Sequence, residues 1–123
     1  MARGRRVSGF FPAGYSGRPD KIGSLLVGIN DDTGRLRYVG HVGTGFTGDM
    51  LAELSEQLTP LGRETSPFGT KIPNPAARDA RWVEPSLVGE VSFAEWTTDG
   101  ILRQPSWRGL RIDKEPAEVH RED

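Results

Sequence analysis

The sequence contains no cysteine, which excludes disulfide scaffolds, thiolate zinc sites, iron–sulfur clusters and cysteine nucleophiles. It has no run of 18 apolar residues, and its first residues lack the apolar stretch of a signal peptide. We therefore expect no membrane partner and a cytoplasmic protein. The two histidines, His41 and His120, lie far apart and have no acidic pair at ligand spacing around them. This scarcity argues against a metal site and against a Ser-His-Asp triad.

The composition favours many turns and short strands. The chain has 123 residues, of which 35% are hydrophobic, and it contains 16 Gly and 9 Pro. Such a length fits one domain spanning residues 1–123, and the Gly and Pro content argues against a helical bundle. A monomer is the expected state.

The charges are unevenly distributed although the formal net charge is only −1. Two basic segments, residues 1–21 and 101–114, flank a middle region in which acidic residues stand unopposed. Most of the basic residues are Arg, whose planar guanidinium suits bidentate contact with phosphate. The near-neutral total thus conceals basic segments that could face phosphates.

The pattern of apolar and turn residues predicts three strands, one helix and then further strands. Thr47 is expected to cap the helix, and Asp31-Asp-Thr-Gly34 and Thr97-Thr-Asp-Gly100 read as hairpin turns. The expected elements are strands over 5–11, 22–30, 35–42, 81–84 and 87–96 and a helix over 48–61, with a loop over 12–19, a long connection over 62–80 and an irregular segment over 104–114.

This order predicts an all-β fold with one helix. It fits an OB-fold, a five-stranded Greek-key barrel with the helix between its third and fourth strands. Other small barrels would give a similar order of elements.

Two motifs are interpreted as structural. Gly43-Thr-Gly-Phe-Thr-Gly48 matches the dinucleotide pattern G-x-G-x-x-G, but no parallel strand directly follows the expected helix, so we interpret it as a strand-to-helix turn. Glu90 and Glu95 have opposite strand parity, which prevents them from forming a catalytic carboxylate pair on a regular strand. A salt-bridge or loop-anchoring role is expected for both.

The C-terminal basic segment holds the strongest candidate chemistry. Arg111 and Lys114 could present a planar fork and a point charge to a polyphosphate, with Asp113 holding the Arg in place. The alternative from the residues alone is a solvated basic loop. Trp82, Trp96 and Trp107 are either core residues or platforms on which the bases of single strands stack.

Six ordered blocks resemble the C-terminal OB domain of bacterial ATP-dependent DNA ligases, of the actinobacterial and end-joining type, and the resemblance covers the chain from about residue 6 to residue 119. The blocks begin at Ile22, Leu36, Ser66, Arg81, Val88 and Leu102, and the last contains Arg111-Ile-Asp-Lys114. This tetrapeptide looks like motif VI of the family. The resemblance implies that Arg111 and Lys114 act on the ATP phosphates with support from Asp113.

The resemblance also implies partners. These are duplex DNA with a nick and a nucleotidyltransferase domain in cis or in trans, in DNA repair, recombination or replication at the nucleoid. ATP and Mg²⁺ would act only in the complete ligase, with no metal residue in this chain. The residues expected to contact DNA phosphates are Arg3, Arg5, Arg6, Arg18, Lys21, Arg35, Arg37, Arg103 and Arg108.

The lysines limit what this chain can do alone. The family attaches AMP to the lysine of a K-x-D-G motif, and none of Lys21, Lys71 and Lys114 has that context. The chain is therefore expected to bind but not to catalyse. A stand-alone nucleic-acid-binding module and a domain that recruits a repair partner through residues 62–80 remain the alternatives.

The isolated chain is expected to take up no AMP when incubated with ATP and Mg²⁺, because it lacks the nucleophile in its required setting. Transfer of label from α-labelled ATP to the chain measures this directly. A labelled band at the mass of the chain would refute the prediction.

Overall fold

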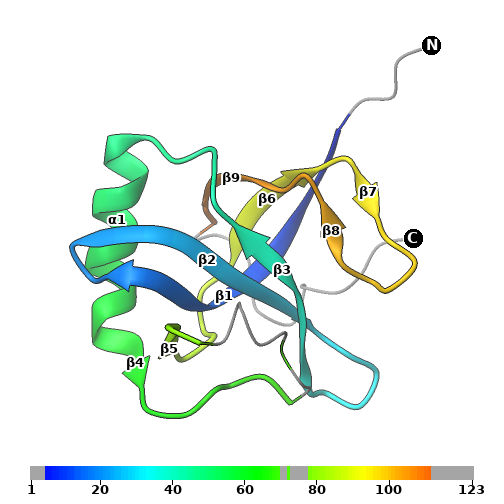
Figure 1. Cartoon of the computed structure of the whole chain (residues 1–123), viewed down its shortest axis with the longest axis horizontal. Coiled ribbons are helices and arrows are strands. Elements are labelled where there is room, and N and C mark those ends of the chain that lie inside the picture. The colour runs from blue at the N-terminus through cyan, green and yellow to red at the C-terminus, as the bar shows by residue number, and fades with distance from the viewer. Residues whose placement is uncertain (1–4, 70–71, 73–77, 112–123) are drawn as a thin grey trace.

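The computed structural model describes residues 5–69, 72 and 78–111, and it is a small β-barrel with one α-helix packed at its side (Figure 1). The mostly β fold with a single helix is confirmed for this part of the chain. Within it, no helix has the length and apolar character needed to cross a membrane. The elements are β1 (Arg6–Arg18), β2 (Lys21–Asn30), β3 (Leu36–Val42), α1 (Gly48–Leu58), the 3₁₀ turn η1 (Thr59–Leu61), β4 (Gly62–Arg63), β5 (Arg81–Val83), β6 (Gly89–Phe93), β7 (Glu95–Trp96), β8 (Leu102–Arg103) and β9 (Ser106–Leu110).

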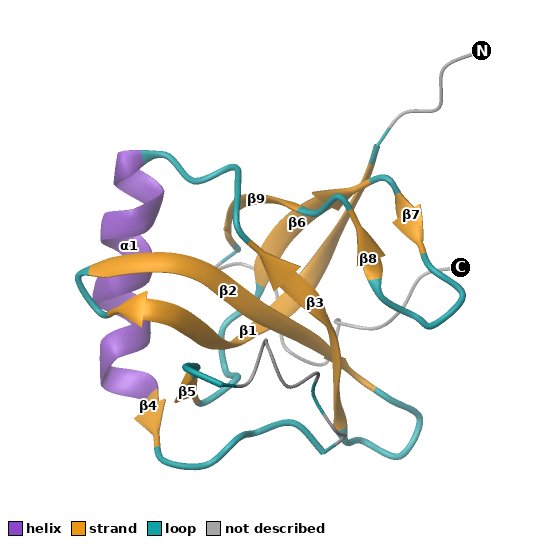
Figure 2. Ribbon diagram, in the orientation of Figure 1, coloured by secondary structure: helices purple, strands orange, loops and turns teal. Residues whose placement is uncertain are grey.

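Strand β1 belongs to both sides of the barrel. Its first half, Arg6–Phe10, pairs with β6, and its second half, Phe11–Arg18, pairs with β2 (Figure 2). The expected loop over 12–19 is therefore wrong for residues 12–18. Pro12 is tolerated because it adjoins a register shift, where the ladder does not need every N–H donor. Gly14 lies under the indole of Trp82, so its missing side chain allows β5 to approach.

The β2–β3 hairpin matches the sequence prediction. The Asp31 carboxylate accepts hydrogen bonds from the N–H groups of Thr33 and Arg35, and Gly34 has a φ of 84°, which favours glycine. A hydrogen bond from the Thr33 hydroxyl is the main cause that lowers the pKa of Asp31. The turn residues thus fix the register that aligns Leu25 with Val42.

Helix α1 begins and packs as the apolar spacing predicts. Thr47 caps it by accepting a hydrogen bond from the Met50 N–H at 3.1 Å, and Leu54 and Leu58 are buried against the barrel. The α-helix ends at Leu58, earlier than expected, and the chain continues as the η1 turn around Pro60.

Strand β9 closes the barrel, so the expected irregular segment over 104–114 is wrong for residues 106–110. It pairs with β6. The backbone N–H of Trp107 also donates, at 2.9 Å, to the carbonyl of Thr44, which lies just after β3. Arg108 is the extra residue of a bulge, and Gly109 there has a φ of 128°. Gly109 therefore shapes this strand rather than interrupting it.

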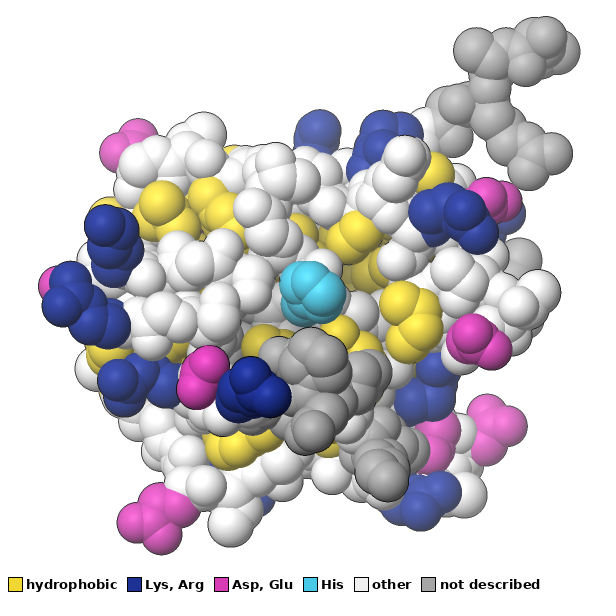
Figure 3. Space-filling model, viewed as in Figure 1, with side chains coloured by type: hydrophobic (Ala, Val, Ile, Leu, Met, Phe, Trp, Pro, Cys, Tyr) yellow, Lys and Arg dark blue, Asp and Glu magenta, His cyan; other side chains and the backbone are white. Residues whose placement is uncertain are grey.

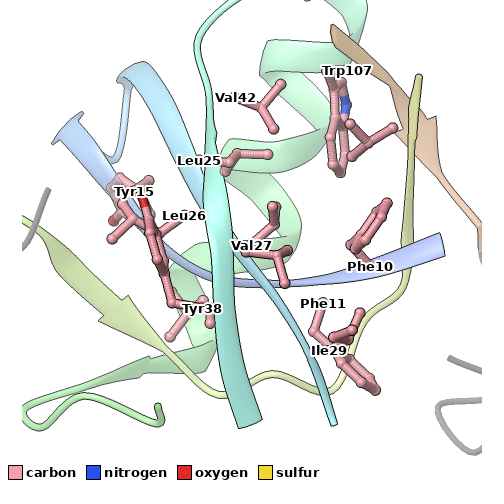
Figure 4. Close-up of a cluster of buried hydrophobic side chains, with 14 of the residues drawn as sticks. Phe10, Phe11, Tyr15, Leu25, Leu26, Val27, Ile29, Tyr38, Val42 and Trp107 are labelled. Atoms are coloured by element: carbon pink, nitrogen blue, oxygen red, sulfur yellow. The ribbon is translucent and has the colours of Figure 1, made fainter. Parts of the chain in front are cut away.

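Trp107 fills one end of the core. Its side chain is only 2% exposed and lies near Phe10 and Val42 in the packed interior (Figure 4). The indole occupies the space above Gly89, and Gly45, with a φ of 93°, presses against the Trp107 backbone. The G-x-G-x-x-G segment is thus a strand-to-helix turn that contacts β9, as expected.

The connectivity is that of the expected OB-fold. Five strands have five or more residues, namely β1, β2, β3, β6 and β9, and α1 lies between β3 and β6 in the chain. The short strands β5 and β4 extend the sheet beyond β1, in the order β3-β2-β1-β5-β4, and β7 and β8 form a separate two-stranded pair. This arrangement is consistent with a five-stranded Greek-key barrel.

Gly89→Ala is expected to destabilise the domain by about 1–3 kcal/mol, because a Cβ there would overlap the Trp107 ring, which cannot move within a packed core. Gly48→Ala is the matched control, since nothing lies within 4 Å of its Cβ position, and it should be neutral or slightly stabilising. Urea unfolding of both variants checks this. Equal free energies of unfolding would contradict the packing argument.

Candidate functional site

Arg111 is held at the end of the closing strand. Its Nη1 lies 2.6 Å from Oε2 of Glu90 on β6, and its backbone N–H donates to the Val88 carbonyl at 2.7 Å. Both side chains of the ion pair are about one-third exposed, so they are screened less than a fully exposed pair. Asp113 and Lys114 lie outside the described residues, and their roles stay predictions.

The interpretation of Glu90 and Glu95 as ion-pair residues is confirmed. Glu90 pairs with Arg111, whereas Glu95 Oε2 lies 3.2 Å from Nε of Arg103 across the β7–β8 pair. Each acidic residue therefore neutralises one of the candidate basic residues.

Three candidate basic residues gather around residues 95–104. The guanidinium of Arg37 donates to the Gly100 carbonyl at 2.9 Å and lies 6.0 Å from the centre of the Trp96 ring. Arg103 belongs to β8, and Arg5 donates to the carbonyls of Ser92 and Gln104. These contacts fasten the β7–β8 hairpin to the start of β1 and to β3.

Gln104 marks the strained point of this cluster. It is the non-glycine residue with a positive φ, 53°, among the described residues, and its carbonyl accepts from Arg5. Arg5 also donates to the Ser92 hydroxyl at 3.3 Å. Some of the N–H donors of the Arg5 guanidinium therefore form hydrogen bonds within the fold.

The other candidate residues lie elsewhere. Arg18 and Lys21 flank the β1–β2 turn, where Arg18 pairs with Asp20 at 3.5 Å and Lys21 borders a hollow of about 510 Å³ between that turn and α1. Arg35 lies at the β2–β3 turn, 3.6 Å from Asp31. Arg6 and Arg108 are exposed on β1 and β9, and Arg3 is outside the described residues.

The fold therefore does not gather the candidate basic residues into one patch. On the face shown in Figure 3, Lys and Arg side chains lie mainly near the rim and a His side chain lies near the middle. Separate surfaces carry them, including one around the β1–β2 turn and one around the β7–β8 hairpin, which lie on opposite sides of the molecule in Figure 1.

The aromatic residues offer little for base stacking. Trp107 is a core residue, which excludes it as a stacking platform. Trp96 is half-buried and packs on Phe10 and Phe93, and Trp82 packs on Phe68. The stand-alone single-strand-binding alternative therefore gains no support from Trp107.

No group of metal-ligating side chains occurs within the described ranges. His41 is exposed, and its Nδ1 lies 3.3 Å from the Tyr38 hydroxyl. Burial raises the pKa of the Tyr38 hydroxyl above its ordinary value.

Sequence reasoning missed three contacts. Strand parity indicated that Glu90 forms an ion pair but not that Arg111 is the partner. The Arg37 contact with Trp96 and the Arg5 contact with Gln104 join residues 59 or more positions apart, and no local pattern signals such pairs.

The chain matches the family described as "ATP dependent DNA ligase C terminal region" over residues 18–114. It is 49% identical over 116 residues to the multifunctional non-homologous end joining DNA repair protein LigD of Mycobacterium tuberculosis, covering 94% of this chain and 15% of that protein. DNA ligase 2 of Methanosarcina mazei is 34% identical over 113 residues, covering 86% of this chain and 18% of the relative. The chain thus spans about 15% of the length of the LigD relatives.

Solved structures of DNA ligases match the fold of this chain. The crystal structure of the ligase domain from M. tuberculosis LigD matches with a TM-score of 0.88 and 44% identity, covering 96% of this chain and 39% of that one. A mycobacterial DNA ligase D complexed with ATP and MES matches with a TM-score of 0.86 and 44% identity, covering 96% and 38%.

Proposed function

Because the chain belongs to the family of ATP-dependent DNA ligase C-terminal regions, we propose that it acts with a nucleotidyltransferase domain to join nicked duplex DNA. The observation that carries the proposal is the match of 96% of this chain to the LigD ligase domain. This chain covers only 39% of that ligase domain, and the part left uncovered is long enough to contain the nucleotidyltransferase domain that the proposal requires. The site of action is DNA at the nucleoid, and the domain works as a monomer.

In the first step of the proposed reaction, Arg111 and Lys114 orient the leaving pyrophosphate of ATP. The step transfers AMP to a lysine of the partner domain, with the α-phosphate bond to pyrophosphate breaking as the bond to the lysine nitrogen forms. A guanidinium and an ammonium near the departing phosphates would stabilise the negative charge that develops on them. Asp113 would support Arg111.

Mg²⁺ has no assigned residue in this domain. The described residues offer no cluster of carboxylate or imidazole ligands, so they do not fit a metal centre. ATP is likewise held only when the partner domain is present.

When the domain engages nicked DNA after the adenylation step, a different surface of the barrel contacts the backbone of the duplex. Contacts to phosphate without base reading suit a ligase, which must accept any sequence. Arg18, Lys21, Arg35, Arg6 and Arg108 are exposed and support this role. The DNA interface comprises a subset of these residues because the fold distributes them over separate surfaces.

In a complete ligase that contains this domain, Arg111→Ala or Lys114→Ala is expected to slow enzyme adenylation by about 10²- to 10³-fold, the scale of losing one preorganised charge-stabilising group. Sealing of a nick that already carries AMP should suffer much less, because no pyrophosphate leaves in that step. Single-turnover rates of the two steps, measured for each variant, check this.

Lys114→Arg serves as a companion variant and should restore adenylation only in part, since a guanidinium differs from an ammonium in shape and reach. Equal losses in adenylation and sealing would overturn the phosphate-orienting assignment. Those residues would then bind DNA or support the barrel.

The chain should bind duplex DNA weakly and without sequence preference, with log affinity falling linearly as log salt rises. Replacing a phosphate-contacting residue such as Lys21 by Ala should reduce the salt slope by about 1. Arg63→Ala is the control, because Arg63 pairs with Glu84 at 3.0 Å and is not a proposed contact. Fluorescence anisotropy at several salt concentrations measures the slopes, and salt-insensitive binding would refute phosphate contact.

A further inference from the structure

The ion pair between Glu90 and Arg111 is unusually well defined for a pair near the surface. Its 2.6 Å separation is shorter than the 3.0 Å of Arg63–Glu84 and the 3.2 Å of Arg103–Glu95. Both partners are also more buried than those of the Arg103–Glu95 pair, whose side chains are 56% and 54% exposed. Less screening makes the Glu90 contact the stronger restraint on its Arg.

The backbone reinforces this restraint. Arg111 N–H donates to the Val88 carbonyl, and Glu90 opposes Gly109 in the β6–β9 ladder. The main chain of Arg111 is therefore tied to Val88, the residue just before β6, and its side chain is tied to Glu90 within β6. Because β6 also pairs with β1, this support belongs to the barrel wall rather than to a loop.

The contact is compatible with phosphate binding. Glu90 engages Arg111 at Nη1, and a guanidinium presents five N–H donors in one plane, so a carboxylate at that nitrogen fixes the plane without using every donor. Fixing the plane before ATP arrives would reduce the rotamer freedom lost in the adenylation step.

We propose that Glu90 is a positioning residue for enzyme adenylation, which orients the Arg111 guanidinium towards the triphosphate of ATP. This inference rests on the proposed function, since it takes Arg111 as a phosphate-contacting residue. It adds a β6 residue, 21 positions earlier in the chain, to the group that prepares the domain for ATP.

The test is a double-mutant cycle in a complete ligase containing this domain. Glu90→Gln keeps the size of the side chain and removes its charge, and it is expected to slow single-turnover adenylation at saturating ATP by about 10-fold. In an Arg111→Ala background the same substitution should have no further effect, because Glu90 acts through Arg111. Glu90→Asp, which keeps the charge, should recover part of the rate.

Glu84→Gln is the matched control, since it removes the charge of another exposed ion pair, with Arg63, outside the proposed machinery. It should leave the adenylation rate unchanged. Affinity for ATP should be retained or increased in Glu90→Gln, because a negative charge near the phosphates is lost. A lower single-turnover rate constant at unchanged amplitude is a result that simple loss of folded protein would not give, because unfolded protein lowers the amplitude and not the rate constant.

Three outcomes would overturn the inference. The first is an adenylation rate for Glu90→Gln equal to that of Glu84→Gln. The second is that Glu90→Gln slows adenylation by the same factor in the Arg111→Ala background as in the wild type. The third is faster adenylation by Glu90→Gln, which would make the ion pair inhibitory. If Arg111→Ala itself leaves adenylation unchanged, the assignment of Arg111 fails and the positioning role falls with it. Failure of the inference alone is recognised because Arg111→Ala still slows adenylation.

Discussion

The packing of Trp107 over Gly89 is the contact on which the rest of the barrel depends. The indole fills the end of the core. The backbone N–H of Trp107 donates to the Thr44 carbonyl, and Gly45 fits against the Trp107 backbone. These contacts bring β9 to β6 on one side and to the end of β3 on the other. Since β9 leads directly into Arg111, the same packing that closes the barrel also sets where the candidate phosphate-orienting residue emerges.

Much of the fold could be predicted because its signals are local. The Thr47 cap, the Asp31–Gly34 turn and the apolar spacing of α1 act within a few residues of one another. Pro12–Arg18 and Ser106–Leu110 were misread because Gly and Pro normally end strands, whereas here they lie at or beside bulges that bend the strands of a small barrel. Distinguishing a bulge from a turn requires knowledge of the partner strand, which one sequence does not supply.

The candidate site was less predictable for a related reason. Residue type and resemblance identified Arg111, but its Glu90 partner comes from another strand. The two basic segments of the sequence suggested phosphate-facing residues without showing how those residues are arranged in space. In the fold, Arg5 and Arg37 bind carbonyls of the β6–β9 region while Arg18 and Lys21 lie at the β1–β2 turn, so closeness in sequence did not translate into one surface.

The long strand β1 also determines when the domain can fold. Its first half pairs with β6, with Arg6 opposite Phe93, so contacts that complete the barrel join residues 87 positions apart. Pairings of such high sequence separation carry a large loop-closure entropy and slow the folding of β-barrels. During synthesis the β1–β3 meander can form early, but half of β1 must wait with unpaired backbone groups until β6, residues 89–93, has left the ribosome.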